Sequence, residues 1–302
     1  MWTLVPDDDP DESSLDFPVF SLDRHDLTGV ASAPIIHGMT EEPHSPPPAI
    51  QRNDDGGYGP VDGAPSEPEA TALVAMAYDD ALARQWLLED QAPDGSLALR
   101  AGSVTRDQTA LGALALDPGP ARERALDHLV THRGYNGDDP NVHAFGWPWT
   151  VGTHGWTEPT AWGLLAVRTL RSSATDRIAD ALAFFQEREC AGGGWNYGSS
   201  ITLGVDLPPY VQTTAMALLG LGDLAPDLAA RGTATLERLW PSESAGLLSL
   251  AITACALRLH GSPESPAVAS ALRNAVPHGG VDTVTAAWVA FGLGASGPWD
   301  TA

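Results

Sequence analysis

The feature that most constrains the fold of this chain is a repeat of short apolar segments rich in Ala and Gly. Six such segments align without gaps, and their first residues are spaced 38, 51, 54, 36 and 36 apart. Each is apolar on nearly every face, which is typical of a helix covered by protein on both sides and packed closely against its neighbours. The six predicted inner helices contain segments that begin at Thr71, Thr109, Thr160, Thr214, Leu250 and Ala286.

Five amphipathic segments separate these inner helices. They span residues 81–90, 121–132, 176–189, 227–239 and 266–275, with apolar residues at helical spacing on one face and charged residues on the other. We interpret them as outer helices. Alternating inner and outer helices can form an open solenoid or close into a toroid, and six inner helices favour closure. The predicted fold is all-α, an α/α toroid of about six helical hairpins, with its seam covered by an N-terminal arm or left as a gap.

The first 55 residues differ from the rest of the chain. Eight prolines lie between Pro6 and Pro48, acidic residues are frequent, and no helical periodicity is present. We predict an extended, Pro-rich acidic arm over residues 1–55, part of which lies on the body of the protein. A single toroid domain is predicted over residues 56–302.

The charge of the chain excludes several classes of partner. Asp and Glu outnumber Arg 39 to 16, no Lys occurs, and the formal net charge is −23. Nucleic acids and anionic lipids bind clustered cations, so we expect neither as a partner. No apolar run approaches the roughly 20 residues that span a bilayer, and the N-terminal sequence lacks the pattern of a signal peptide. We therefore expect a cytoplasmic protein without an integral membrane segment.

A second element recurs in the links that precede inner helices. It combines a Gln, an Asp-Gly or Gly-Gly turn and, in two of three cases, an aromatic residue, and it spans residues 51–59, 91–96 and 186–198. Glycine supplies the positive φ that ends a helix, and Gln can hydrogen-bond free carbonyls there. The pattern resembles the Q-x-x-D-G-x-W repeat of the squalene cyclase and protein prenyltransferase superfamily, over residues 51–295. The resemblance implies an α/α toroid with a central apolar cavity that takes isoprenoid chains.

The prenyltransferase branch of this superfamily binds zinc through an Asp, a Cys and a His at the starts of inner helices. Here Cys255 lies in the middle of an inner segment and Cys190 ends an outer one, while His143 and His154 have no evident third ligand. We predict no metal site and no other cofactor. The cysteines are interpreted as buried free thiols and the histidines as structural or pocket-lining residues.

The cyclase branch carries a D-x-D-D-T-A motif whose middle Asp donates a proton. Alignment on Thr160-Ala161 places Glu158 at the donor position, although Trp156 and Pro159 replace the flanking aspartates. Further candidates for the acid site, at the same repeat position or in the preceding link, are Glu69, Asp107, Gln212 and Asp139. Because parallel inner helices begin at one mouth of a toroid, we expect these groups to surround it. The alternative is that the acids only stabilise helix N-termini.

Aromatic residues concentrate in the link before Glu158. Long loops in compact domains are usually functional, and aromatic faces stabilise a nearby cation by up to about 2 kcal/mol. The candidate substrate-binding residues are Trp147, Trp149, His154 and Trp156 from this link, Trp195, Tyr197 and Tyr210 from the next, Gln212, and Trp288 from the last inner segment. The alternative is that the Trp residues only brace turns.

Three functions remain open on this sequence. The first is an acid-initiated cyclase or isomerase of an isoprenoid, with Glu158 as general acid and Asp139, Glu69 or Asp107 modulating its proton. The second is a non-catalytic toroid that binds a lipid or a protein. The third is a carbohydrate-active toroid with paired carboxylates in an open polar groove. An apolar bore with Glu158 pointing into it would favour the first function, and a bore filled by side chains would favour the second.

Overall fold

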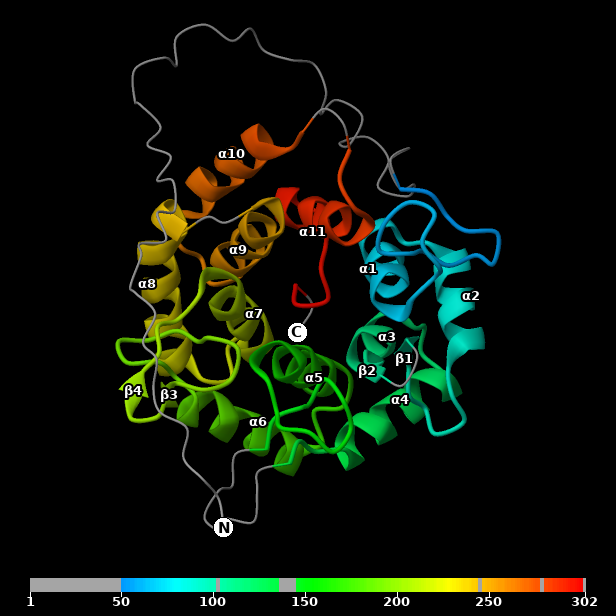
Figure 1. Cartoon of the computed structure of the whole chain (residues 1–302), viewed down its shortest axis with the longest axis horizontal. Coiled ribbons are helices and arrows are strands. Elements are labelled where there is room, and N and C mark those ends of the chain that lie inside the picture. Colours follow the sequence, from blue (N-terminus) through cyan, green and yellow to red (C-terminus); the bar gives the residue numbers. More distant parts are fainter. Residues whose placement is uncertain (1–49, 102–103, 136–144, 244–245, 278–279, 301–302) are drawn as a thin grey trace, which may run out of the picture. The chain divides into compact units, whose positions relative to one another are not determined.

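The computed structural model describes residues 50–101, 104–135, 145–243, 246–277 and 280–300. Its contacts divide the chain into Met1–Glu41, which lies outside the described residues, and Glu42–Ala302. The described part is mostly helical, with eleven helices and two short hairpins, so the all-α prediction is confirmed (Figure 1). Most of the predicted arm, residues 1–49, lies outside the described residues.

Each predicted inner segment lies within one helix. These helices are α1 (Pro68–Tyr78), α3 (Thr109–Ala115), α5 (Thr157–Leu170), α7 (Val211–Leu221), α9 (Leu247–Leu259) and α11 (Thr283–Leu293). Each packs against the next in this order, and α11 packs back against α1, so the six contacts form a closed cycle (Figure 1). Most residues of these helices are buried, as their apolar composition requires.

The amphipathic segments form the predicted outer layer. It consists of α2 (Ala81–Asp90), α4 (Pro120–Thr131), α6 (Thr175–Glu187), α8 (Pro226–Glu243) and α10 (Ser265–Ala275), and each of these packs on the inner helix that precedes it. No outer helix follows α11 within the described residues. At that seam the chain near Pro60 contacts the start of α11, because the Thr283 amide donates a hydrogen bond to the Pro60 carbonyl at 3.0 Å.

Small residues allow the inner helices to approach closely. Gly220 of α7 faces the backbone of Ala161 in α5, where an added Cβ would lie 2.7 Å from the Ala161 Cα. Gly292 of α11 meets the Ala251 carbonyl of α9 in the same way, at 3.0 Å. Glycine is therefore required at these two positions, since a side chain there would force the neighbouring helices apart.

Two antiparallel hairpins interrupt the links between helices. The first pairs β1 (Ala98–Ala101) with β2 (Val104–Asp107) before α3, and the second pairs β3 (Ile201–Thr202) with β4 (Val205–Asp206) before α7. The sequence analysis did not predict them. Within the described residues, no helix is long and apolar enough to cross a membrane. Both cysteines are free and buried.

Candidate active site

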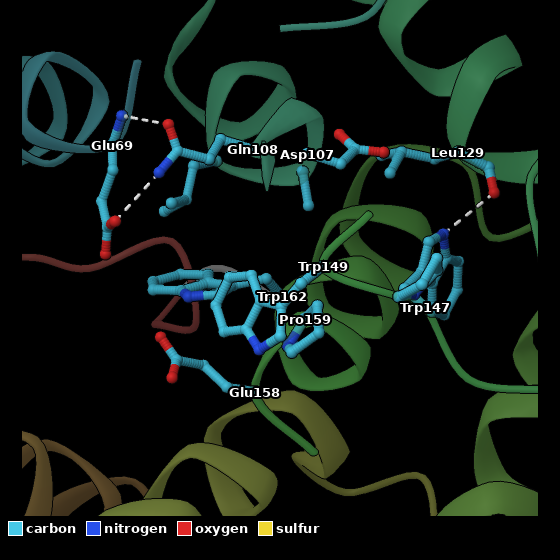
Figure 2. A pocket seen from close by; sticks show the side chains of 12 residues that line it. Glu69, Asp107, Gln108, Leu129, Trp147, Trp149, Glu158, Pro159 and Trp162 are labelled. Atoms are coloured by element: carbon cyan, nitrogen blue, oxygen red, sulfur yellow. Dashed lines mark hydrogen bonds between the residues drawn. The ribbon is translucent and has the colours of Figure 1, made fainter. Parts of the chain in front are cut away.

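A narrow pocket lies at the N-terminal ends of α1, α3 and α5 (Figure 2). Its volume of about 20 Å³ is room for roughly one water molecule. The side chains in its wall that bear on chemistry are Glu69, Asp107, Gln108, Trp147, Trp149, Glu158 and Trp162. The three acids placed at one repeat position by the sequence therefore do meet at a single pocket.

Glu158 is the acid of this pocket whose pKa is raised both by burial and by a neighbouring like charge. It lies in the first turn of α5, directly before Pro159 and two residues after Trp156, which precedes the helix in extended conformation. Burial and the charge of Glu69 raise the pKa of Glu158 to about 7, against the opposing effect of Arg106. Its carboxyl group forms no hydrogen bond with the described residues. Near neutral pH, Glu158 is thus present both as the acid and as the carboxylate.

Glu69 is held in place on α1 by neighbours from the link before α3. Its backbone amide donates to Gln108 Oε1 at 3.1 Å, and Gln108 Nε2 donates to Glu69 Oε2 at 2.9 Å. The same Oε2 lies 3.5 Å from Arg106 Nη1. Burial raises the pKa of Glu69, while Arg106 and Gln108 oppose this effect. Gln108 and Arg106 thereby favour the carboxylate form of Glu69, whose charge in turn favours the protonated form of Glu158.

Arg106 is a cation set among several acids. It interacts with Glu67, Glu69 and Glu158, and burial together with Glu69 also raises the pKa of Glu67. The Arg106 guanidinium lies over the Trp149 ring, 3.9 Å from its centroid. Because three carboxyl groups surround one guanidinium, the local charge disfavours an anionic ligand.

Asp107 has a different environment from the other two acids. Its Oδ1 accepts hydrogen bonds from the Thr109 amide at 2.9 Å and the Thr109 hydroxyl at 2.6 Å, and its Oδ2 lies 3.2 Å from His128 Nε2. Burial alone would raise the pKa of Asp107, but His128 and Thr109 outweigh it and lower the pKa. Figure 2 shows the Asp107 carboxylate at the opposite edge of the pocket from Glu158. These contacts agree with the alternative in which Asp107 only stabilises the N-terminus of α3.

Two of the candidate Trp residues brace turns. Trp195 is fully buried and its Nε1 donates to the Phe185 carbonyl at the end of α6, at 2.8 Å. Trp147 Nε1 donates likewise to the Leu129 carbonyl near the end of α4, at 3.0 Å, although one of its faces also lines the pocket. Each indole thus satisfies a carbonyl that a helix terminus leaves free.

The other candidates lie elsewhere. His154, Trp156, Tyr197 and Tyr210 line a separate, open surface groove near α7. Gln212 accepts a hydrogen bond from the Ser249 hydroxyl at 3.0 Å. Asp139 and His143 lie outside the described residues. The structure therefore brings Glu69, Asp107, Glu158, Trp147 and Trp149 together at one pocket, and it places His154, Trp156, Tyr197 and Tyr210 at another.

Three residues of the site escaped the sequence analysis. Trp162 lies inside an inner segment at the position equivalent to Trp288 and could have been found by extending the repeat alignment. Gln108 and Arg106 carry no sequence signal, because their role depends on the β1–β2 hairpin that turns them toward α1.

The interior of the helix cycle is bridged by aromatic rings below this pocket. Trp162 of α5 and Trp288 of α11 come from opposite helices of the cycle, and their ring centroids are 5.6 Å apart. Trp299, in the chain that follows α11, stacks on Trp288 with centroids 5.5 Å apart and planes within 5°. Trp162 lines the pocket that Glu158 also lines, and the buried indoles of Trp288 and Trp299 pack behind it.

The site offers a carboxyl group that titrates near neutrality, a neighbouring anion and several indole faces. In the described part of the chain, no group of three or more His, Cys, Asp or Glu side chains could hold a metal ion. Neither a known family nor a characterised protein matches this sequence. The chemistry of the pocket is accordingly inferred from its own geometry: proton transfer to or from an uncharged ligand.

Proposed function

We propose that the closed cycle of helices is an α/α toroid of the squalene cyclase type, and that Glu158 is a general acid acting on a hydrophobic, isoprenoid-like molecule. The observation that carries the proposal is the Glu158 pKa of about 7 in a pocket walled by indole rings. A general acid works best when its pKa lies near the pH of its surroundings. The resemblance of the repeat pattern supports the choice of an isoprenoid.

The proposed reaction transfers one proton and returns it. Protonated Glu158 donates its proton to one carbon of an alkene, whose π electrons form the new C–H bond and leave a cation on the other carbon. The faces of Trp149 and Trp162 stabilise this cation by up to about 2 kcal/mol each. Loss of a proton from a neighbouring carbon to the Glu158 carboxylate gives an isomerised or cyclised alkene and restores the acid.

Charge and volume narrow the substrate class. The excess of carboxyl groups over Arg106 argues against a diphosphate and for a hydrocarbon, alcohol or epoxide. The pocket volume of about 20 Å³ has room for about one water molecule, so an isoprenoid reaches Glu158 only when side chains move. Trp149 and Arg106, which lie on a loop and a hairpin rather than on an inner helix, are the side chains we propose to move.

The test has two steps. Lipids that co-purify with the protein are identified by mass spectrometry, and the purified protein is then incubated with the identified compound or, failing one, with farnesol and squalene epoxide. Glu158→Gln should abolish turnover while circular dichroism and ligand binding stay unchanged. Turnover that survives this substitution would refute the general-acid role.

A second function, a non-catalytic lipid-binding toroid, is favoured by the aromatic bridge of Trp162, Trp288 and Trp299 across the interior. Under this function a lipid co-purifies in equal amount with wild type and with Glu158→Gln, and neither protein changes it. The narrow indole-walled pocket does not provide the open polar groove that glycan cleavage needs, so no observation favours the carbohydrate function.

A further inference from the structure

A leucine occupies an unfavourable position at the tip of the β3–β4 hairpin. Leu203 and Gly204 form its two-residue turn, and both have positive φ, of 50° and 78°. Such turns strongly prefer Asn, Asp or Gly, because the left-handed region is unfavourable for bulky side chains. The Leu203 side chain is 98% exposed, so packing within this chain does not compensate for the strain. A strained and exposed leucine at a tip indicates a role in contact with another molecule.

The tip belongs to a larger apolar projection. Ile201 and Val205, which flank the turn on the two strands, are each more than half exposed. We name these three side chains, Ile201, Leu203 and Val205, the hairpin knob. Ile201 pairs with Asp206 and Val205 pairs with Thr202, so Ile201 and Val205 lie on opposite faces of the hairpin, and the projection is apolar on both faces. Exposed apolar side chains gathered in this way mark interaction sites in soluble proteins.

An aromatic groove lies close to this knob in the same link. Trp156, Tyr197 and Tyr210 line it together with Leu207 and Arg188, and its volume is about 520 Å³. Tyr197 and Tyr210 pack on each other with ring centroids 5.4 Å apart, and all three aromatic side chains are exposed. The hairpin leaves the groove wall at Ser199 and returns to it at Leu207, where the Leu207 amide donates to the Ser200 carbonyl at 2.8 Å. One surface thus carries an apolar projection and an apolar recess.

The charges of the projection and the recess are complementary. Asp206 ends β4 beside the hairpin knob, is exposed, and forms no ion pair with the residues that the structure describes. Arg188 lies in the groove wall, where its Nε is buried without a hydrogen-bond partner in the described part of the chain. Its charge partner there is Glu187, at 3.5 Å from Nη2. The carboxylate of Asp206 thus lies beside the hairpin knob, and the guanidinium of Arg188, whose Nε lacks a hydrogen-bond partner among the described residues, lies in the groove wall.

We infer that this surface is the interface of a twofold-symmetric dimer, in which the hairpin knob of each chain enters the aromatic groove of the other. A twofold interface uses the same patch on both chains, so a patch that holds both knob and groove is complementary to itself. In this arrangement Asp206 of one chain faces Arg188 of the other, twice.

Sedimentation equilibrium of the full chain over a range of concentrations tests the dimer. The wild type should dimerise. Leu203→Asn should be monomeric and, because Asn tolerates the left-handed turn, should melt at a higher temperature than the wild-type monomer measured at high dilution. Leu82→Gln is the matched control, since it removes another exposed leucine, from α2, and should leave the dimer intact.

Charge reversal tests the pairing itself. Asp206→Arg and Arg188→Asp should each weaken dimerisation by about tenfold or more, and the doubly reversed chain should recover it. Circular dichroism verifies that each variant is folded, and Asp206→Arg, on an exposed hairpin, keeps the test decisive if Arg188→Asp does not fold. A wild type that stays monomeric, a Leu203→Asn protein that dimerises normally, or a double variant that fails to recover would each overturn the proposal.

A different partner would also be detected. If the wild-type chain stays monomeric and instead floats with phosphatidylcholine vesicles in a Leu203-dependent manner, the knob contacts lipid and the dimer proposal is wrong. The dimer is independent of the proposed catalysis. Glu158→Gln should therefore dimerise as the wild type does, whichever result its turnover assay gives.

Discussion

Replacing Glu158 by Gln should stabilise the folded chain at alkaline pH and not at acidic pH. The Glu158 pKa is raised from 4.5 to about 7 on folding, because burial and the charge of Glu69 disfavour its carboxylate. Each pKa unit corresponds to about 1.4 kcal/mol, so ionising Glu158 in the folded state costs about 3 kcal/mol. Gln has nearly the same shape and carries no charge, so the substitution removes this cost.

The direction of the pH dependence follows from which state holds the proton. Between pH 4.5 and 7 the folded chain keeps a proton that the unfolded chain has released, so wild-type stability falls as the pH rises through this window. Below pH 4.5 Glu158 is protonated in both the folded and the unfolded chain, so the cost of ionising it is absent. Above the window the cost is complete. The gain in unfolding free energy from Glu158→Gln should therefore grow from near zero at pH 4.5 to about 3 kcal/mol at pH 8.

Urea unfolding of both proteins at several pH values between these limits measures the gain, with equal m-values as the criterion that the transitions are comparable. Glu89→Gln, at an exposed position on α2, is the control for the removal of a surface carboxyl group. A Glu158→Gln protein whose stability relative to wild type is the same at pH 4.5 and pH 8 would refute the assignment of a raised pKa, and with it the physical basis of the general-acid role.

Two further predictions concern the neighbours of the acid. Glu69→Gln should lower the pKa of Glu158 and Arg106→Met should raise it, because Glu69 favours and Arg106 disfavours the protonated form of Glu158. The pH dependence of turnover or of stability should therefore move in opposite directions in the two variants. A shift in the same direction in both variants would contradict this prediction. Trp299→Ala should cost about 3–5 kcal/mol in urea unfolding, because it removes a buried indole from the interior, and a cost below about 1 kcal/mol would show that Trp299 is not packed there.

The helices could be predicted because their signals are local. An inner segment needs only a run of small and apolar residues, and an outer segment needs one apolar face, so both can be recognised without knowledge of the neighbours. The aligned segments do not mark the ends of the helices. The first segment begins at Thr71, but α1 begins at Pro68, because proline suits the first turn of a helix. The hairpins were missed because their pairing gives no comparable periodic signal in strands of two to four residues.

The site could be located from the sequence, but its members could not be ranked. Glu69, Asp107 and Glu158 share one repeat position, and the repeat therefore predicts that they meet. What distinguishes them is not local: His128, from a helix 21 residues further along, holds Asp107 as a carboxylate, whereas Glu158 has no such partner among the described residues. Two aromatic residues of the link before Glu158 also differ in their surroundings. Trp149 lines the pocket, whereas Trp156 lines the surface groove.

The indole bridge across the interior has a kinetic consequence. Since the buried indoles of Trp162, Trp288 and Trp299 pack together in the interior between α5 and α11, we expect the pocket to be a dead end that opens at the N-terminal ends of the inner helices. Any ligand that enters must leave by the same route. Under the proposed function, a product therefore has to depart before the next substrate can arrive, so product should compete directly with substrate, and the opening near Trp149 should control the rate of exchange.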